Sequence, residues 1–224
     1  MIEILFEDDY FLAAVKPSGL PSQATVDKSR PDFFNTLKKQ LQEERGKDFY
    51  LALHHRLDRD TSGVMIFAKN KLANEPLADL FKKHQIQKTY LCLARKKKKL
   101  EEKWIVENHL LEKRDAKTKK MKMVSVKSGG DKALTHFQTL KIFDKGVLIQ
   151  AQPRTGRMHQ IRVHLAENGM GIFGDDLYDA PTTPKAERLM LHAFALDFVH
   201  PMTQEKIRLE AALPEAMTSF MELL

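Results

Sequence analysis

The feature that most constrains the fold is that several short, strand-like segments of this chain follow one another with only a turn between them. Residues 3–6 and 11–16 are separated by the turn residues Asp8-Asp9, and residues 134–143 and 146–152 follow each other in the same way. Turn-forming residues between two such segments are typical of a β-hairpin. The pattern therefore predicts an α+β fold with a mixed, largely antiparallel central sheet, rather than a regular alternation of strands and helices.

Helices are expected where apolar residues recur three or four positions apart behind a capping residue. Asp32 and Asn70 are suitable caps, because their side chains can accept hydrogen bonds from the first N–H groups of a helix. Asn168-Gly169 is typical of a helix end. No repeat and no long Gly/Ser linker divides the chain, so we expect a single domain over residues 1–224, with helices flanking its sheet. The expected helices cover residues 32–43, 71–83, 158–167 and the segment after Pro214, and further strands cover residues 89–94, 193–199 and 207–210.

Composition and charge limit the classes of protein to which this chain can belong. The 224 residues are 42% hydrophobic, and they include no apolar run of the roughly 18 residues that span a bilayer. The acidic amino terminus lacks the features of a signal peptide, and the single Cys92 excludes an internal disulfide and a cysteine-based zinc site. The net charge of +7 suggests a polyanionic partner, although many basic proteins bind no nucleic acid. We therefore expect a soluble, cytoplasmic protein. The sequence carries no signal for the oligomeric state, and a monomer is the default expectation.

A dense polar segment at residues 54–63 is the first candidate site. It is followed by the apolar run of residues 64–68, which we expect to be a buried strand. Polar side chains on a loop that a rigid element holds are typical of active sites. Asp58 stands between Arg56 and Arg59, and neighbouring cations favour the ionised form of a carboxylate, which can then serve as a nucleophile or a base.

Two other interpretations of this segment stay open from the residues alone. Asp58 can belong to a surface cluster of ion pairs, which perturbs carboxylates as well. A metal-dependent hydrolase is the second alternative, because His54 and Asp58 have the i, i+4 spacing of helical metal sites. Gly63 and the β-rich run after it argue against a helix here, and no cysteine or His-Glu-x-x-His pattern supports a metal. The ligands of such a metal would be His54, His55, Asp58 and Asp60.

Two further segments carry candidate functional side chains. Tyr90 shares one face of its expected strand with the small residues Cys92 and Ala94, so its ring can stack on a planar base or belong to the core. Residues 154–164 contain three arginines and two histidines. On the expected helix, Arg162 can pair with a buried carboxylate, contact phosphate through its planar fork, or lie on a solvated basic face.

Taken together, these segments resemble the RluA family of RNA pseudouridine synthases. Residues 55–63, with the sequence HRLDRDTSG, resemble the catalytic motif of that family, and Lys88-Thr89-Tyr90 resembles its lysine-x-tyrosine motif. Residues 154–164, with the sequence RTGRMHQIRVH, are similar to its third motif almost position for position. The similarity covers nearly the whole chain, since it also includes residues 16–21, Gly174-Asp175 with Tyr178, Leu191-His192-Ala193 and His200-Pro201.

The resemblance implies an enzyme that isomerises a uridine of ribosomal or transfer RNA to pseudouridine, without a cofactor or a metal, in an active-site cleft across the sheet. It implies that Asp58 is the essential carboxylate at the junction of sugar and base, and that Arg162 pairs with Asp58. Tyr90 would stack on the flipped uracil and could act in proton transfer, and Arg56 would fill the space left by the base or contact its phosphate. Further RNA contacts are expected within the same motifs, from Lys88, Arg157, His159 and Gln160.

Other features bear on how RNA would be recognised. We expect no separate S4-type RNA-binding domain, because the catalytic-type sequence begins at once, so the catalytic domain itself would recognise RNA. The basic stretches at residues 96–99 and 113–127 can contribute to this, or they can be solubilising charge. Residues 169–172 lack the proline that family members usually carry after the third helix, which affects the expected loop and not the catalytic assignment. A catalytically silent RNA-binding module is the remaining alternative, and it predicts damage to motifs that are intact here.

Overall fold

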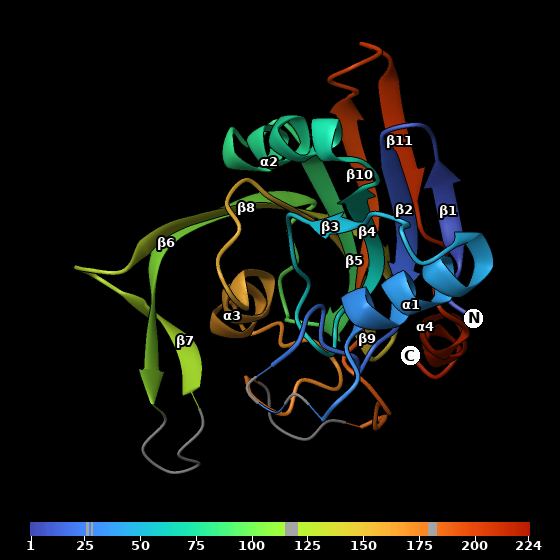
Figure 1. The fold of residues 1–224 in the computed structure, drawn as a ribbon. Helices are drawn as coiled ribbons and strands as arrows, with labels where there is room; N and C mark the ends of the chain where they lie inside the picture. The colour runs from blue at the N-terminus through green and yellow to red at the C-terminus, as the bar shows by residue number, and fades with distance from the viewer. Residues whose placement is uncertain (26, 28, 115–120, 179–182) are drawn as a thin grey trace. The chain divides into compact units, whose positions relative to one another are not determined.

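The computed structural model describes residues 1–25, 27, 29–114, 121–178 and 183–224 (Figure 1). The chain divides into two compact units, one formed by Met1–Lys88 with Ala193–Ala212 and the other by Thr89–His192 with Leu213–Leu224. Each unit has its own buried apolar cluster. The expectation of a single domain over residues 1–224 stays a prediction. Among the described residues, no helix is long and apolar enough to cross a membrane.

The first unit contains the hairpin that opens the chain. Its two strands pair antiparallel, as predicted, with Glu7 opposite Leu12. The second strand of this hairpin pairs antiparallel with the apolar run that follows the polar segment, so that Lys16 lies opposite Gly63. The polar segment is thereby fixed to the middle of the sheet. In order, the strands are β1 (Ile4–Glu7), β2 (Phe11–Lys16), β4 (Ser62–Ala68) and β10 (Leu191–Val199, of which Ala193–Val199 belong to this unit). Outside this order, β11 (Lys206–Glu210) pairs antiparallel with β10, and the short β3 (Ala52–Leu53) pairs with β4.

The two helices of the first unit begin at the predicted caps. The carboxylate of Asp32 accepts a hydrogen bond from the N–H of Asn35 at 3.0 Å, and the side chain of Asn70 accepts one from the N–H of Ala73 at 3.0 Å. Both helices bury an apolar stripe against the unit's core, as helical spacing requires. The helix predicted over residues 71–83 is a short 3-10 turn followed by an α-helix. The elements are α1 (Phe33–Arg45), η1 (Lys71–Ala73) and α2 (Asn74–Lys82).

Gly63 marks a close approach between two strands of the first unit. Its φ of +128° lies outside the range that other L-residues adopt readily, and a Cβ at this position would stand 2.2 Å from the carbonyl oxygen of Ala193. Backbone atoms cannot move aside as a flexible side chain can. The glycine therefore allows β4 and β10 to pack directly behind the polar segment.

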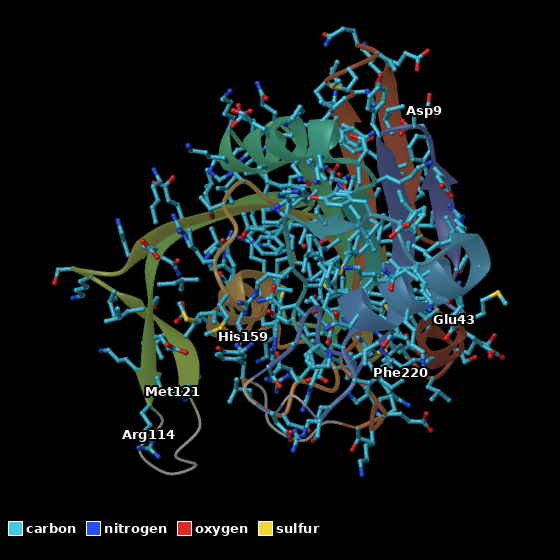
Figure 2. All side chains as sticks on the ribbon, in the orientation of Figure 1. Asp9, Glu43, Arg114, Met121, His159 and Phe220 are labelled. Carbon is cyan, nitrogen blue, oxygen red and sulfur yellow. The ribbon has the colours of Figure 1, made fainter. Side chains whose placement is uncertain are left out.

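The sheet of the second unit contains two strands that the sequence did not predict, β6 (Lys103–Arg114) and β7 (Met121–Val126). β6 was missed because Ile105 is 61% exposed, so its apolar residues do not mark one buried face. In Figure 2, Arg114 and Met121 lie at the paired ends of β6 and β7, next to the residues of the predicted basic stretch at 113–127 that fall outside the described ranges. In order, the strands are β5 (Gln87–Arg95, of which Thr89–Arg95 belong to this unit), β9 (Gly146–Pro153), β8 (Asp131–Ile142), β6 (Lys103–Arg114) and β7 (Met121–Val126).

The helices of the second unit differ from the prediction at one end. α3 (Gln160–Glu167) begins two residues later than expected, because His159 has a φ of 54° and cannot continue a right-handed helix. The helix ends as predicted, with Gly169 at a φ of +72°. α4 (Glu215–Met221) follows Pro214, as expected. The α+β class and the largely antiparallel pairing are thus confirmed.

We predict that Gly63→Ala destabilises the protein by at least about 3 kcal/mol, since the added methyl group must displace the backbone at Ala193. Gly169→Ala is the matched control, because Gly169 also has a positive φ but no atom within 4 Å of its Cβ position. The control should cost only about 1 kcal/mol of backbone strain. Urea unfolding of the two variants measures both costs, and equal losses would show that the close approach contributes nothing.

Candidate active site

A buried lysine holds the backbone beside Asp58. The side chain of Lys16 is fully buried, and its ammonium donates hydrogen bonds to the carbonyl oxygens of Pro17 at 2.8 Å, Leu20 at 2.7 Å and Arg59 at 2.9 Å. An ammonium carries three N–H donors, so three carbonyls can match them. The residue after Asp58 is therefore tied to the segment at residues 16–21.

Two serines extend this attachment to both sides of Asp58. The hydroxyl of Ser22 donates to the carbonyl of Leu57 at 2.7 Å and accepts from the N–H of the same residue at 2.9 Å. The hydroxyl of Ser18 donates to the carbonyl of Asp60 at 2.7 Å. The backbone on either side of Asp58 is thus braced by residues 16–22, which explains why this loop can be rigid without being helical or extended.

The sequence analysis expected both Arg56 and Arg59 to act as cations beside Asp58, but Arg59 has a different carboxylate as its partner. Arg59 forms a two-pronged pair with Asp60, with distances of 2.9 and 3.1 Å. Arg56 is exposed, and Asp58 is half-buried. Arg59 thus pairs with Asp60, and the braced backbone positions the carboxylate of Asp58.

The two histidines in front of Asp58 serve the structure of the first unit. Nε2 of His55 accepts a hydrogen bond from the N–H of Ile66 at 3.0 Å, and its ring stacks on Phe81 with centroids 4.4 Å apart. Burial lowers the pKa of His55 to about 3, so the imidazole is neutral at pH 7, as an accepting Nε2 requires. Nε2 of His54 lies 3.1 Å from the side-chain oxygen of Asn74. Among the described residues, no three histidine, cysteine or acidic side chains gather as metal ligands.

Lys88 and Tyr90 lie on the same strand, one at the end of the first unit and the other in the second. Lys88 is half-buried, with its ammonium 5.4 Å from the centroid of Phe81, and burial lowers its pKa. Tyr90 is half-buried and packs against the apolar cluster that contains Cys92 and Ala94. Part of the Tyr90 side chain therefore belongs to the core, which is one of the two interpretations left open by the sequence, and another part is exposed.

Arg162 is buried in the second unit and pairs with a carboxylate that the sequence analysis did not assign to it. Its Nε and Nη2 donate to the two carboxylate oxygens of Asp175 at 2.8 and 2.7 Å. The side chains are only 8% and 1% exposed, respectively. The interpretation of Arg162 as part of a solvated basic face is therefore wrong. Its expected pairing with Asp58 stays a prediction.

Tyr178 lies against the same guanidinium. The Cζ atom of Arg162 is 5.1 Å from the centroid of the Tyr178 ring. The Tyr178 hydroxyl accepts a hydrogen bond from the N–H of Met123 at 2.8 Å and lies 2.8 Å from Nδ1 of His159. Figure 2 shows His159 beside α3. His159 and Arg162 thus meet at Tyr178, although His159 precedes the helix and does not share its face.

Gln160 braces the backbone around the start of α3. It is buried, and its side-chain oxygen accepts hydrogen bonds from the Thr155 hydroxyl and from the N–H of Arg157. Its side-chain nitrogen donates to the Leu134 carbonyl and to the Thr135 hydroxyl. Both polar atoms of the amide have hydrogen-bond partners inside the unit. The expected RNA contact of Gln160 stays a prediction. Arg157 itself is exposed, with Nε donating to the carbonyl of Lys132 at 3.1 Å.

His164 is a second histidine that the fold keeps neutral. Its two ring nitrogens lie 3.0 Å from the Thr135 hydroxyl and 3.0 Å from the side-chain oxygen of Asn108. Burial lowers its pKa to about 4. The sequence places this residue in the third motif, and in the structure it is a buried residue of α3.

We predict that acid destabilises the protein because His55 and His164 are neutral when folded and protonated when unfolded. The histidines of the unfolded chain take up protons as the pH falls below about 6.5, whereas the folded protein does not protonate them until the pH approaches their folded pKa values of about 3 and about 4. The free energy of unfolding therefore decreases as the pH falls below about 6.5. Each residue contributes a loss of as much as about 2 kcal/mol at pH 5. Thermal melting between pH 7 and pH 5 measures this. His164→Gln should make the melting temperature depend less on pH, and the exposed His109→Gln should not. The same dependence of melting temperature on pH in the parent and both variants would contradict the account.

We predict that Ser22→Ala loosens the loop that carries Asp58, because it leaves the N–H and carbonyl of Leu57 without the serine hydroxyl. A buried pair of this kind is worth about 1–3 kcal/mol, so trypsin should cleave after Arg56 or Arg59 at least about 10-fold faster. The exposed Ser29→Ala is the control, since its hydroxyl donates to the nearby Asp27 carboxylate at the surface. Fragment masses identify the cleaved bonds, and unchanged cleavage in Ser22→Ala would refute the brace.

Comparison with known proteins identifies the family of this chain. The RNA pseudouridylate synthase family matches residues 10–167. The chain is 34% identical over 218 residues to Uncharacterized RNA pseudouridine synthase YhcT of Bacillus subtilis, covering 96% of this chain and 70% of that protein. It is 35% identical over 225 residues to Ribosomal large subunit pseudouridine synthase C of Vibrio cholerae, covering 96% of this chain and 68% of that protein.

Solved structures agree with the sequence comparison. Human RNA Pseudouridylate Synthase Domain Containing 4 superposes with a TM-score of 0.78 at 25% identity, covering 96% of this chain and 90% of that one. Human RNA Pseudouridylate Synthase Domain Containing 1 gives a TM-score of 0.76 at 25% identity, covering 95% and 83%. The resemblance seen in the sequence motifs is therefore confirmed, and the chain belongs to the RNA pseudouridylate synthase family and is an RNA pseudouridine synthase.

Proposed function

We propose that this enzyme isomerises a specific uridine of ribosomal or transfer RNA, that it flips the base out of the RNA to do so, and that Asp58 is the catalytic carboxylate. Ribosomal RNA is favoured because several relatives are named large-subunit ribosomal pseudouridine synthases. The observation that carries the proposal is the braced backbone around Asp58, where Leu57, Arg59 and Asp60 are each hydrogen-bonded to residues 16–22.

The isomerisation of uridine needs a carboxylate held in a fixed position, and it consumes no second substrate. The N1–C1′ bond of uridine breaks, the base rotates, and a C5–C1′ bond forms, while the C5 proton leaves and N1 gains one. No net oxidation or reduction occurs, so the stoichiometry needs no redox cofactor. A carboxylate placed at the junction of sugar and base can act as nucleophile or base in these steps, and its rigid backbone limits the geometries it samples.

We propose that Tyr90 and Arg162 act on the same nucleotide as Asp58. A half-buried tyrosine whose core-facing part is fixed by packing can offer its ring as a stacking surface for the uracil. The bidentate pair with Asp175 uses Nε and Nη2 of Arg162. A guanidinium has five N–H donors in a planar fork, so this pair is compatible with a second carboxylate at the edge that carries Nη1.

The remaining RNA contacts follow from exposure and charge. Arg56 is exposed two residues before Asp58, so it is suited to the space left by the extruded base or to its phosphate. Arg157 is exposed, and Lys88 and His159 are half-buried, which suits phosphate or base contacts near the reacting nucleotide. Basic side chains on phosphates would offset the few kcal/mol that unstacking a base costs.

We predict that Asp58→Asn abolishes turnover, with at least about a 1,000-fold loss of rate, while RNA affinity stays within about 3-fold of the parent. The change preserves shape and removes the negative charge. Release of tritium from RNA containing [5-³H]uridine measures turnover, because the C5 hydrogen leaves in each cycle. A filter-binding titration with the same RNA measures affinity.

Asp60→Asn is the matched control for this experiment. Asp60 lies in the same loop, but its carboxylate pairs with Arg59 at the surface. This control should retain most of the parent's activity. Substantial tritium release by Asp58→Asn would remove Asp58 from the mechanism, and loss of activity in both variants would point to the loop's charge rather than to one carboxylate.

A further inference from the structure

The buried carboxylate behind Arg162 has no role in the activity described so far. We propose that Asp175 is a positioning residue for the reaction, which fixes the guanidinium of Arg162 in one plane and one rotation, and that Tyr178 holds the same plane from its face. This inference rests on the proposed function of Arg162 at the nucleotide. It assigns no contact with RNA to Asp175 itself.

The first support is the geometry of the pair. Nε and Nη2 of Arg162 each meet a different oxygen of Asp175, at 2.8 and 2.7 Å. Two parallel hydrogen bonds define an orientation, whereas a single contact defines only a distance. Both side chains are almost fully buried, so water competes little for either group. The pair therefore restricts rotation of the guanidinium about its own stem.

The second support is that the carboxylate is itself fixed. One oxygen of Asp175 also accepts hydrogen bonds from the N–H groups of Leu177 at 3.1 Å and Tyr178 at 3.2 Å. The preceding Gly174 has a φ of +77°, and a Cβ there would stand 1.9 Å from the carbonyl oxygen of Arg188. The turn can therefore approach the backbone at Arg188 only with glycine at this position. A fixed turn supplies a fixed acceptor to Arg162.

The third support is the tyrosine that completes the enclosure. The ring of Tyr178 lies 5.1 Å from Cζ of Arg162, a distance typical of a cation over an aromatic face. The hydroxyl of this ring is held by the N–H of Met123 on β7 and by the imidazole of His159. Asp175 thus orients the guanidinium of Arg162 along one edge, and Tyr178 orients it across one face. Neutralising the charge of Arg162 would need only the carboxylate, so the second contact points to control of orientation.

The consequence is preorganisation. A guanidinium that must act on a substrate loses less freedom at the moment of reaction when its plane is fixed beforehand. The effect should appear in the chemical step and not in RNA affinity, because Asp175 is buried behind Arg162. This separates a positioning role from a role in binding.

The test compares kcat and KM for tritium release in the parent and in Asp175→Asn. Asparagine keeps an oxygen for the N–H groups of the turn, but it places an NH₂ group against a donor of Arg162. We expect kcat to fall by about 100-fold and KM to change by less than about 3-fold. Thermal melting of each protein is measured in parallel, so that loss of fold is recognised. A kcat within about 3-fold of the parent in a folded Asp175→Asn protein would overturn the inference.

A double-mutant cycle with Arg162→Lys distinguishes positioning from general structural damage. Lysine keeps the positive charge and has no planar fork to orient. If Asp175 acts through Arg162, adding Asp175→Asn to Arg162→Lys should lower kcat by less than about 3-fold further, although the same change costs about 100-fold in the parent. A repeated loss of about 100-fold would show that Asp175 acts independently of Arg162, which contradicts the proposal.

Tyr178 gives a second route if Asp175→Asn does not fold. Tyr178→Leu removes the ring from the face of Arg162 and should lower kcat by about 10-fold in the parent but not in Arg162→Lys. A kcat of a folded Tyr178→Leu protein within about 3-fold of the parent would overturn the inference. Failure of the proposed function looks different: the parent would release no tritium, or Arg162→Lys would retain the parent's kcat.

Discussion

The loop that carries Asp58 depends on the burial of one ammonium group. A buried ammonium without partners is too costly to keep, and Lys16 avoids this cost through the carbonyls of Pro17, Leu20 and Arg59. Two of these carbonyls belong to its own segment, and the third belongs to the loop that carries Asp58. Neither segment can move alone without leaving the charge poorly solvated. The polar loop thereby gains the rigidity of the sheet that carries Lys16.

The second unit also contains a buried cation, but its hydrogen-bond acceptor is of a different kind. Arg162 is also a buried cation, but a carboxylate and an aromatic face replace the three carbonyls. The difference suits the geometry of the groups, because carbonyls can surround a compact ammonium, while a planar guanidinium matches the two oxygens of a carboxylate. In both units, a cation that is costly to bury is held by partners within its own unit.

The parts of the structure that the sequence predicted are those that local residues determine. The opening hairpin, the caps Asp32 and Asn70 and the end of α3 at Gly169 depend on residues only a few positions apart. The start of α3 was wrong because the left-handed conformation of His159 is not visible in apolar spacing. β6 was missed because an exposed Ile105 obscures its alternation.

The candidate site was predictable only as far as its motifs. Asp58, Tyr90 and Arg162 stood out by residue type and resemblance, whereas their supports depend on contacts distant in sequence. Lys16 and Arg59 are 43 positions apart, and no local pattern joins them. Gly174-Asp175 and Tyr178 were visible as part of the resemblance, but a sequence alone does not reveal which cation a buried carboxylate will meet.

The central claim is that this chain makes pseudouridine in cellular RNA through the carboxylate of Asp58. Single-nucleotide pseudouridine mapping of total RNA tests it most directly, in cells that lack the gene and carry either the parent gene or Asp58→Asn. The account predicts that at least one RNA position loses its pseudouridine without the gene and regains it with the parent only. Restoration of that position by Asp58→Asn, or a map that is the same in all three cell lines, would contradict it.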